Sequence, residues 1–269
     1  MDKRLRKLQL IEIELLDEYV RICDKYDLTY YINYGTLLGA VRHKGFIPWD
    51  DDLDVVMPCK DYEKFCQIAD KEIDHNKFYF HDYKDPRYYD GLVRIRRKGT
   101  IYSDKKSMRL HMENYGIWMD IFRLDNVDNP HSLVFRYQTM AKKILGHICF
   151  HRAMVDLNNL SLNRKIVHYI SCILPLGAWN HLRDWSFRLC KNDNTKYVIN
   201  FASRYKASIE LIEREKYGQP VKIEFEGKLY NAPHEYEYIL KHIYGDYMKL
   251  PPVEKRGVDH NPEVWEINI

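Results

Sequence analysis

The sequence predicts a mixed α/β (α+β) fold, in which a mixed sheet with flanking helices is interrupted by a helical insertion between residues 130 and 205. Two observations lead to this prediction. Helical and extended patterns alternate over the first 60 residues, and extended segments continue as far as residue 122. From His131 to Cys190 the pattern is helical and mixes basic with apolar residues. Such an order is typical of a sheet that carries an inserted helical unit.

Each element has its own signal. Apolar residues recur at three- and four-residue spacing from Leu5 to Ile22, which predicts an amphipathic helix at residues 3–26. The β-branched and aromatic run Thr29–Tyr34 predicts a strand that ends at Gly35-Thr36. The elements predicted after it are a helix at Leu37–Arg42, a loop at His43–Trp49, a strand at Asp50–Met57, a helix opened by Pro58, strands at 77–82, 91–97 and 116–122, helices within His131–Asn158 and Asn163–Cys190, a strand pair around Val221–Tyr230, a helix near His234–Tyr244, and a tail from Pro251.

The composition argues against several protein classes. Lys and Arg total 42 against 39 Asp and Glu, so the chain lacks the basic footprint of a protein that binds nucleic acid. The six cysteines include no C-x-x-C pair, so neither a zinc site nor a secreted disulfide scaffold is expected. The amino-terminal segment resembles an amphipathic helix rather than a signal peptide, and no apolar run reaches spanning length. We therefore expect a cytoplasmic protein.

Four aspartates lie within five positions, at Asp50, Asp51, Asp52 and Asp54. If they lie on a strand, Asp50, Asp52 and Asp54 share one face, with successive members roughly 7 Å apart. Carboxylates at this spacing are typical ligands of Mg²⁺ or Mn²⁺. A solvated acidic turn is the alternative for an isolated D-x-D motif. The apolar residues that follow at 55–57 favour the metal site.

A further acid lies alone in the apolar strand predicted at residues 116–122. Asp120 is flanked there by Trp, Met, Ile and Phe, where an acid is rarely needed for packing. If the two acidic strands are neighbours, Asp120 either completes a metal triad with Asp52 and Asp54 or accepts the nucleophile's proton. The alternative is a capping or turn residue at a strand end, and that is the role expected for Asp125.

The segment Tyr34–Gly39 has the pattern of a strand, a turn and a helix with small residues at the turn. Backbone N–H groups at a helix N-terminus bind anions, and Gly35 permits a close approach of phosphate. Thr36 adds a hydroxyl donor, or is a simple N-cap. The Gly-Thr signal is weak alone and becomes specific when Asp52 and Asp54 follow it.

Gly35-Thr36 followed by Asp52-Leu53-Asp54 resembles the signature of the nucleotidyltransferase fold shared with DNA polymerase β. The whole stretch from Tyr34 to Asp54 resembles, almost residue for residue, the LicD family, which includes fukutin and fukutin-related protein. The resemblance continues at Val93–Thr100, Gly116–Leu124, Phe225–Gly227 and Tyr244–Met248, and it covers most of the chain outside the helical middle.

The resemblance implies a LicD-type phosphotransferase that moves phosphocholine from CDP-choline to a hydroxyl of a cell-surface glycan, such as a lipopolysaccharide or teichoic acid precursor, and releases CMP. A phospho-polyol from CDP-ribitol or CDP-glycerol is the alternative group. Asp52 and Asp54 would be metal ligands, Asp120 the third acid, and Asp50 a further acid of the pattern. The zinc element of the fukutin-related branch has no counterpart in this sequence.

Other side chains are assigned to the substrates. Arg94 and Arg96 alternate onto one face of their strand and could bind phosphate, unless they belong to a solvated edge. Tyr34 and Trp49 flank the motif and could stack on cytosine or choline. The general base stays open between Asp120, Asp50 and His43.

Two interpretations fit the helical segment at residues 131–191. It is either a helical hairpin that covers the sheet, or a basic and apolar surface that contacts the inner face of a membrane. We expect a catalytic core at residues 1–130, an acceptor-binding insertion at 131–205 for a glycan or lipid-linked glycan, and a completing segment at 206–269. Two different functions also compete with transfer from a CDP-linked donor: nucleotidyl transfer from CTP with release of pyrophosphate, and an inactive scaffold.

Overall fold

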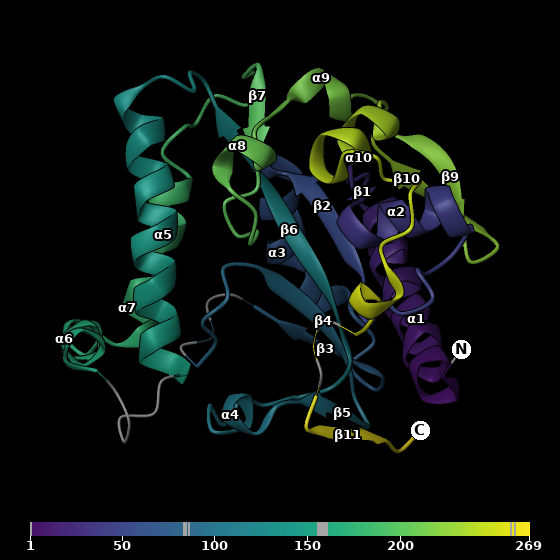
Figure 1. Ribbon diagram of the computed structural model, residues 1–269, viewed down its shortest axis with the longest axis horizontal. Helices are drawn as coiled ribbons and strands as arrows, with labels where there is room; N and C mark the ends of the chain where they lie inside the picture. Colours follow the sequence, from purple (N-terminus) through teal and green to yellow (C-terminus); the bar gives the residue numbers. More distant parts are fainter. Residues whose placement is uncertain (1, 83–84, 86, 155–160, 259, 261) are drawn as a thin grey trace.

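The computed structural model describes residues 2–82, 85, 87–154, 161–258, 260 and 262–269 (Figure 1). Its main sheet has the strand order β1-β2-β6-β4-β3, and β7 and β8 extend it from the carboxyl end of β6. The bounds are β1 Tyr31–Ile32, β2 Asp54–Pro58, β3 Phe78–His81, β4 Val93–Arg97, β6 Trp118–Val127, β7 Tyr197–Ile199 and β8 Ile212–Glu213. In this sheet β2 and β6 run parallel and the other pairs antiparallel, which confirms the predicted mixed α/β fold.

Strand β6 is the axis of the sheet. Its first half lies between β2 and β4, and its second half pairs with β7. The parallel register places Asp54 beside Asp120, so the two acidic strands are neighbours, which was the condition set for a joint role of these acids.

Two helices pack against the sheet and against each other, α1 (Lys3–Lys25) and α3 (Cys59–Glu72). The apolar stripe of α1 is buried, and the ring of Tyr19 meets Phe65 of α3 edge to face at 5.1 Å between centroids. Full burial of each large apolar side chain stabilises the fold by about 1.5–3 kcal/mol. These side chains belong to the main hydrophobic core, which lies beneath the acidic segment.

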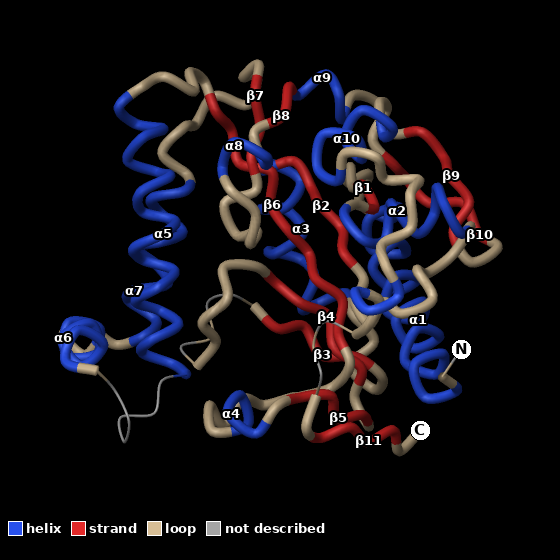
Figure 2. The backbone as a smooth tube through the Cα atoms, viewed as in Figure 1, coloured by secondary structure: helices blue, strands red, loops and turns tan. Residues whose placement is uncertain are grey.

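Three helices form a group beside the sheet: α5 (Leu133–Met154), α6 (Leu162–Ser171) and α7 (Leu176–Phe187). Figure 2 shows them as helices at the edge of the molecule, away from the strands of the main sheet. Helix α5 packs on both α7 and α6, and Pro175 separates the last two. Among the described residues no helix is long and apolar enough to cross a bilayer.

The remaining elements surround the sheet. They are α2 (Tyr34–His43), α4 (Lys105–Met108), α8 (Ala207–Glu210), α9 (Arg214–Tyr217), α10 (Tyr236–Tyr244), a 3-10 turn at Val253–Lys255, and the hairpin of β9 (Val221–Phe225) and β10 (Lys228–Ala232). A second small sheet pairs β5 (Thr100–Ser103) with β11 (Val264–Ile267).

Four local predictions were wrong. Residues 50–53 form a loop, and the strand begins at Asp54. Helix α2 begins at Tyr34, so Gly35 and Thr36 lie in its first turn instead of before it, because Asn33 already takes the N-cap position. The tail predicted after Pro251 ends in β11, which pairs with β5, a strand that was not predicted.

The fourth concerns Asp125, which is neither a cap nor a turn residue. It lies inside β6, is buried, and accepts a hydrogen bond from the Arg123 guanidinium at 2.6 Å. The same guanidinium donates to Asp184 of α7 at 2.7 Å, so a buried charge network joins the helical group to the sheet.

Candidate active site

A cleft of about 970 Å³ opens where β2 and β6 begin. Asp50, Asp52, Asp54 and Asp120 all line it, together with residues from α2, β4, the 202–205 loop and the segment after α10. The structure therefore brings together all four acids that the sequence singled out.

Asp54 and Asp120 are held in place by the backbone. The Asp120 N–H donates to the Leu53 carbonyl at 2.9 Å, and the Asp54 N–H donates to the Thr36 hydroxyl at 2.8 Å. Thr36 is buried and does not line the cleft, so in this structure its hydroxyl anchors the start of β2. This hydrogen bond connects the Gly-Thr pair to the D-x-D motif.

Asp51 faces away from its acidic neighbours. Its carboxylate accepts a hydrogen bond from the Tyr102 hydroxyl at 2.5 Å and one from the backbone N–H of His260 at 3.2 Å. The predicted alternation is therefore confirmed, although the backbone at 50–53 is extended loop rather than sheet. His260 itself enters the cleft wall from a segment close to the carboxyl end of the chain.

The loop before the acids is fixed from two sides. Gln9 of α1 donates to the Asp50 carbonyl at 3.0 Å. Glu226, at the turn between β9 and β10, accepts from the Phe46 N–H at 3.1 Å and from the Arg6 guanidinium at 2.6 Å. Charge-assisted bonds of this kind keep the loop rigid, which a site built on closely spaced carboxylates requires.

Electrostatics in the cleft favour a bound cation. Burial raises the pKa of Asp54 well above its usual range, and the nearby Asp52, Asp120 and Asp50 raise it further. Burial likewise raises the pKa of Asp52. Directly beneath, the buried Glu12 of α1 has a pKa raised by burial and then by the same aspartates, and its Oε2 has no hydrogen-bond partner among the described residues. Concentrated negative charge of this kind is relieved either by protons or by a divalent cation.

The donor set suits Mg²⁺ or Mn²⁺. Magnesium is usually held by one or two carboxylates plus water and phosphate oxygens, and Asp52 and Asp54 would be such a pair. Among the described residues no group of three His, Cys, Asp or Glu side chains has the spacing of a complete metal site. Asp120 accepts instead from Arg94, whose Nε lies 2.5 Å from its Oδ1, so it could join a metal only by sharing or releasing that ion pair.

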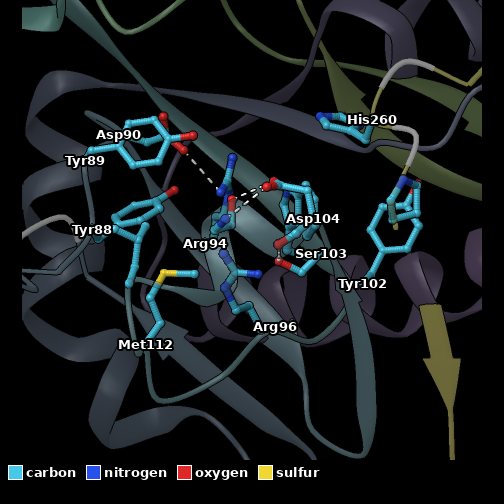
Figure 3. Close-up of a pocket in the computed structure, with 14 residues that line it drawn as sticks. Tyr88, Tyr89, Asp90, Arg94, Arg96, Tyr102, Ser103, Asp104, Met112 and His260 are labelled. Atoms are coloured by element: carbon cyan, nitrogen blue, oxygen red, sulfur yellow. Dashed lines mark hydrogen bonds and ion pairs between the residues drawn. The ribbon is translucent and has the colours of Figure 1, made fainter. Parts of the chain in front are cut away.

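Arg94 and Arg96 have different surroundings. Arg94 lines the cleft and also pairs with Asp90 at 3.2 Å, as the close-up of the neighbouring pocket shows (Figure 3). Arg96 is buried, lies over the Trp118 ring, and donates to His81 Nδ1 at 3.1 Å. It lines the neighbouring pocket but not the cleft, so the two arginines share a strand face without sharing the cleft.

The two aromatic candidates both line the cleft but differ in exposure. Tyr34 is buried, and its hydroxyl donates to Glu210 at 2.8 Å and accepts from Asn200 at 2.9 Å. Trp49 lies partly exposed on the cleft wall, with the Arg256 guanidinium over its ring at 5.1 Å. His43, the third candidate base, packs against Trp49 and is not among the lining residues.

Position 35 must be a glycine because the Asp50 carboxylate packs against it. A Cβ at this position would lie 2.7 Å from Asp50 Oδ2. We expect Gly35→Ala to lower kcat/KM about tenfold by displacing that carboxylate, with little change in the free energy of unfolding. The control for stability is Gly146→Ala in α5, where a Cβ meets no atom within 4 Å. It should stabilise the helix by about 0.5–1 kcal/mol. Unchanged activity in Gly35→Ala would contradict the role of Gly35.

Several cleft residues gave no signal in the sequence. Arg204 is exposed on the 202–205 loop and faces the acids closely enough to lower the pKa of Asp54 against the larger effect of burial. Among the described residues it has no ion-pair partner. Lys249 and Lys255 add cations to the cleft wall, and Asp90 and Asp104 add acids on the side of Tyr89. All of them come from loops and short turns outside the sheet and the longer helices, where only the tertiary fold determines proximity.

Comparisons with known proteins give one matching family model and several similar chains. A family model described as LicD/FKTN/FKRP, nucleotidyltransferase domain, matches residues 27–140, which include the four cleft acids, Gly35 and Arg94. The chain is similar to the lipopolysaccharide cholinephosphotransferase LicD of Haemophilus influenzae, with 28% identity over 97% of both chains. It is also similar to uncharacterized proteins of Rickettsia typhi, 38% identical over 29% of each chain, and Rickettsia prowazekii, 50% identical over 16% of each chain.

Proposed function

Because the chain belongs to the LicD family and is a LicD-type phosphotransferase, we propose that it transfers phosphocholine from CDP-choline to a glycan hydroxyl and releases CMP. The observation that carries the proposal is the meeting of Asp52, Asp54 and Asp120 in one cleft with Arg204 facing them. Acids that bind a metal opposite a free cation are what transfer of a phospho group needs, since charge develops on phosphate oxygens as the bond to the leaving group breaks.

The bonds change at the phosphorus next to choline. The acceptor oxygen forms a bond to this phosphorus, the bond to the bridging oxygen breaks, and the electron pair leaves with CMP. The acceptor proton passes to a carboxylate, and Asp120 and Asp50 both line the cleft while His43 does not. Mg²⁺ or Mn²⁺ held by Asp52 and Asp54 would supply the counter-charge for the phosphates.

The acceptor would enter from the helical group. A second cavity of about 440 Å³ lies between α5, α7 and the loops at 89–91 and 201–204, and is lined by Lys142, Gly146 and Arg183. It shares Tyr89, Asp90 and Arg204 with the cleft, so a chain bound there would reach the acids. A glycan or lipid-linked glycan fits this position, and the expectation that residues 131–205 bind the acceptor remains part of the proposal.

The experiment that tests the function is a donor panel. The purified protein is incubated with a glycan acceptor and CDP-choline, CDP-ribitol, CDP-glycerol or CTP, with Mg²⁺ present. Acceptor-dependent CMP from CDP-choline alone is the expected result. Pyrophosphate from CTP would show nucleotidyl transfer instead, and CMP from a polyol donor alone would change the transferred group.

Arg204 is expected to bind the donor phosphates. Arg204→Ala should lower kcat/KM about 10²-fold, because a charge-assisted contact to the reacting phosphate is lost. Arg204→Lys should recover part of the activity, since it restores charge without the planar fork. Lys206→Ala, two residues away and exposed, is the control. Initial rates measured over a range of CDP-choline concentrations test this. An Arg204→Ala protein as active as the control would exclude the assignment.

Metal binding should appear in stability as well as in turnover. The raised pKa values of Asp54 and Glu12 mean that their contribution to stability is present at low pH and lost as pH rises through those values. Without metal we therefore expect the melting temperature to fall over a pH range that begins at the ordinary carboxyl pKa of about 4. Mg²⁺ should raise it at the upper end, by about 2–4 °C for each kcal/mol of binding energy, and much less at the lower end. A pH-independent response to Mg²⁺, followed by differential scanning calorimetry with and without a chelator, would contradict this.

A further inference from the structure

We infer that the outer face of α5 and α6 is a docking surface for an anionic phospholipid bilayer, on which α6 lies parallel to the membrane plane. Most of the large hydrophobic side chains that are exposed among the described residues belong to α5, α6, α7 and the segment joining the last two. In Figure 1 α5 runs along one edge of the molecule and α6 lies at its foot, both far from the β9–β10 hairpin.

Helix α6 has its apolar stripe on the outside. Leu162, Ile166 and Tyr169 follow one another at four- and three-residue spacing, which places them on one face of the helix. Leu162 is 74% exposed and Tyr169 is 70% exposed, and Ile173, one turn further on, is 72% exposed. The only described residue of α6 that is buried is Ser171. An amphipathic helix normally turns its apolar stripe toward a core, so this stripe has no partner within the described part of the chain.

Helix α5 presents a matching stripe. Leu133, Tyr137, Met140 and Ile144 recur at four- and three-residue spacing and are exposed. With about 100° between successive residues, this stripe lies opposite Lys142, which faces the cavity beside the cleft. The Lys142 side of α5 therefore faces the cavity beside the cleft, and the apolar stripe on the opposite side is free to contact another surface.

The excess of Lys and Arg in this part of the chain indicates that the contacted surface is anionic lipid. From 131 to 181 the sequence holds a single acid, Asp156, against six Lys and Arg, in a chain whose totals are nearly balanced. Arg136, Lys143 and Lys165 are exposed beside the two apolar stripes. Apolar side chains that enter the acyl boundary, flanked by Lys and Arg that reach the headgroups, are typical of helices that lie in a bilayer interface. A soluble protein partner would not require the near absence of acids.

The test is vesicle flotation with no donor or acceptor present, so its outcome is independent of the proposed phosphotransfer. The full chain is mixed with vesicles of phosphatidylcholine, or of phosphatidylcholine with one-third phosphatidylglycerol. We expect it to float with the anionic vesicles at low salt and to be released by high salt. A triple variant, Leu162→Ser, Ile166→Ser and Tyr169→Ser, should bind at least tenfold more weakly. The double variant Lys143→Glu and Lys165→Glu should lose the preference for anionic lipid.

Two controls make the result specific. Leu229→Ser, which changes a 63% exposed side chain on β10, should bind vesicles like the unchanged protein. All variants replace exposed residues and should keep the same melting temperature. Failure of the unchanged protein to float, or an equal loss in Leu229→Ser, overturns the inference. A dimer seen by sedimentation that dissociates in the triple variant, without vesicle binding, would assign the face to a second copy of the chain.

Discussion

Replacing Asp54 with asparagine is expected to abolish turnover while making the metal-free protein more stable. Asp54 is buried among like charges, and burial followed by repulsion from Asp52 and Asp120 raises its pKa. Asparagine keeps the shape and can donate to the neighbouring carboxylates, so the repulsion disappears. We expect a gain on the order of 1 kcal/mol in the free energy of unfolding without metal. Loss of a metal ligand should lower kcat by at least about 10³-fold.

Urea unfolding without metal and CMP release with Mg²⁺ measure the two effects separately. Asp51→Asn is the matched control, because Asp51 lies in the same loop but faces Tyr102 and His260. It should keep most of the turnover and lose stability. If Asp54→Asn retained full turnover, Asp54 would have no part in the chemistry. If it destabilised the metal-free protein, the charge argument would be wrong.

Replacing Arg123 with methionine is expected to cost about 3–5 kcal/mol of folding free energy, because it leaves the buried Asp125 without its paired cation, while Asp184 keeps its ion pair with Arg188 at 3.1 Å. Arg123 donates to Asp125 at 2.6 Å and to Asp184 at 2.7 Å, and it is buried with Asp125 inside β6. Burial raises the pKa of Asp125 to about 6 even with the arginine present. Without Arg123 the pKa of Asp125 should lie higher still, so the cost of the substitution should shrink as pH falls toward about 6.

Chemical unfolding at two pH values tests this, and the double variant Arg123→Met with Asp125→Asn should recover part of the loss. Hydrogen exchange supplies a second readout. Asp184 belongs to α7, so the backbone amides of α7 should exchange faster in Arg123→Met, whereas the amides of β2 should change little. A uniform increase across the chain would mean that the network stabilises the whole fold instead of joining the helical group to it.

The sequence predicted the central acids because their signal is local. Asp54 and Asp120 each sit in an apolar run, and alternation alone separated Asp51 from its neighbours. The resemblance to a family then chose the reaction. Proximity across the chain has no local signal, which is why Arg204 and His260 were missed. Thr36 lies between these two cases. The sequence singled it out as a site residue, but the partner of its hydroxyl, the Asp54 N–H, depends on how α2 packs against β2.

The pairing of β5 with β11 has a consequence for how the polypeptide is made. The two strands are separated by more than half of the sequence. The backbone groups of β5 that pair with β11 therefore have no partner until all the intervening residues have been synthesised. Contacts this distant slow folding, and an unpaired edge is a template for aggregation. His260, which completes the cleft wall beside Asp51, arrives in the same late segment. A nascent chain would thus build its acidic cluster early and acquire the wall that encloses it among its last steps.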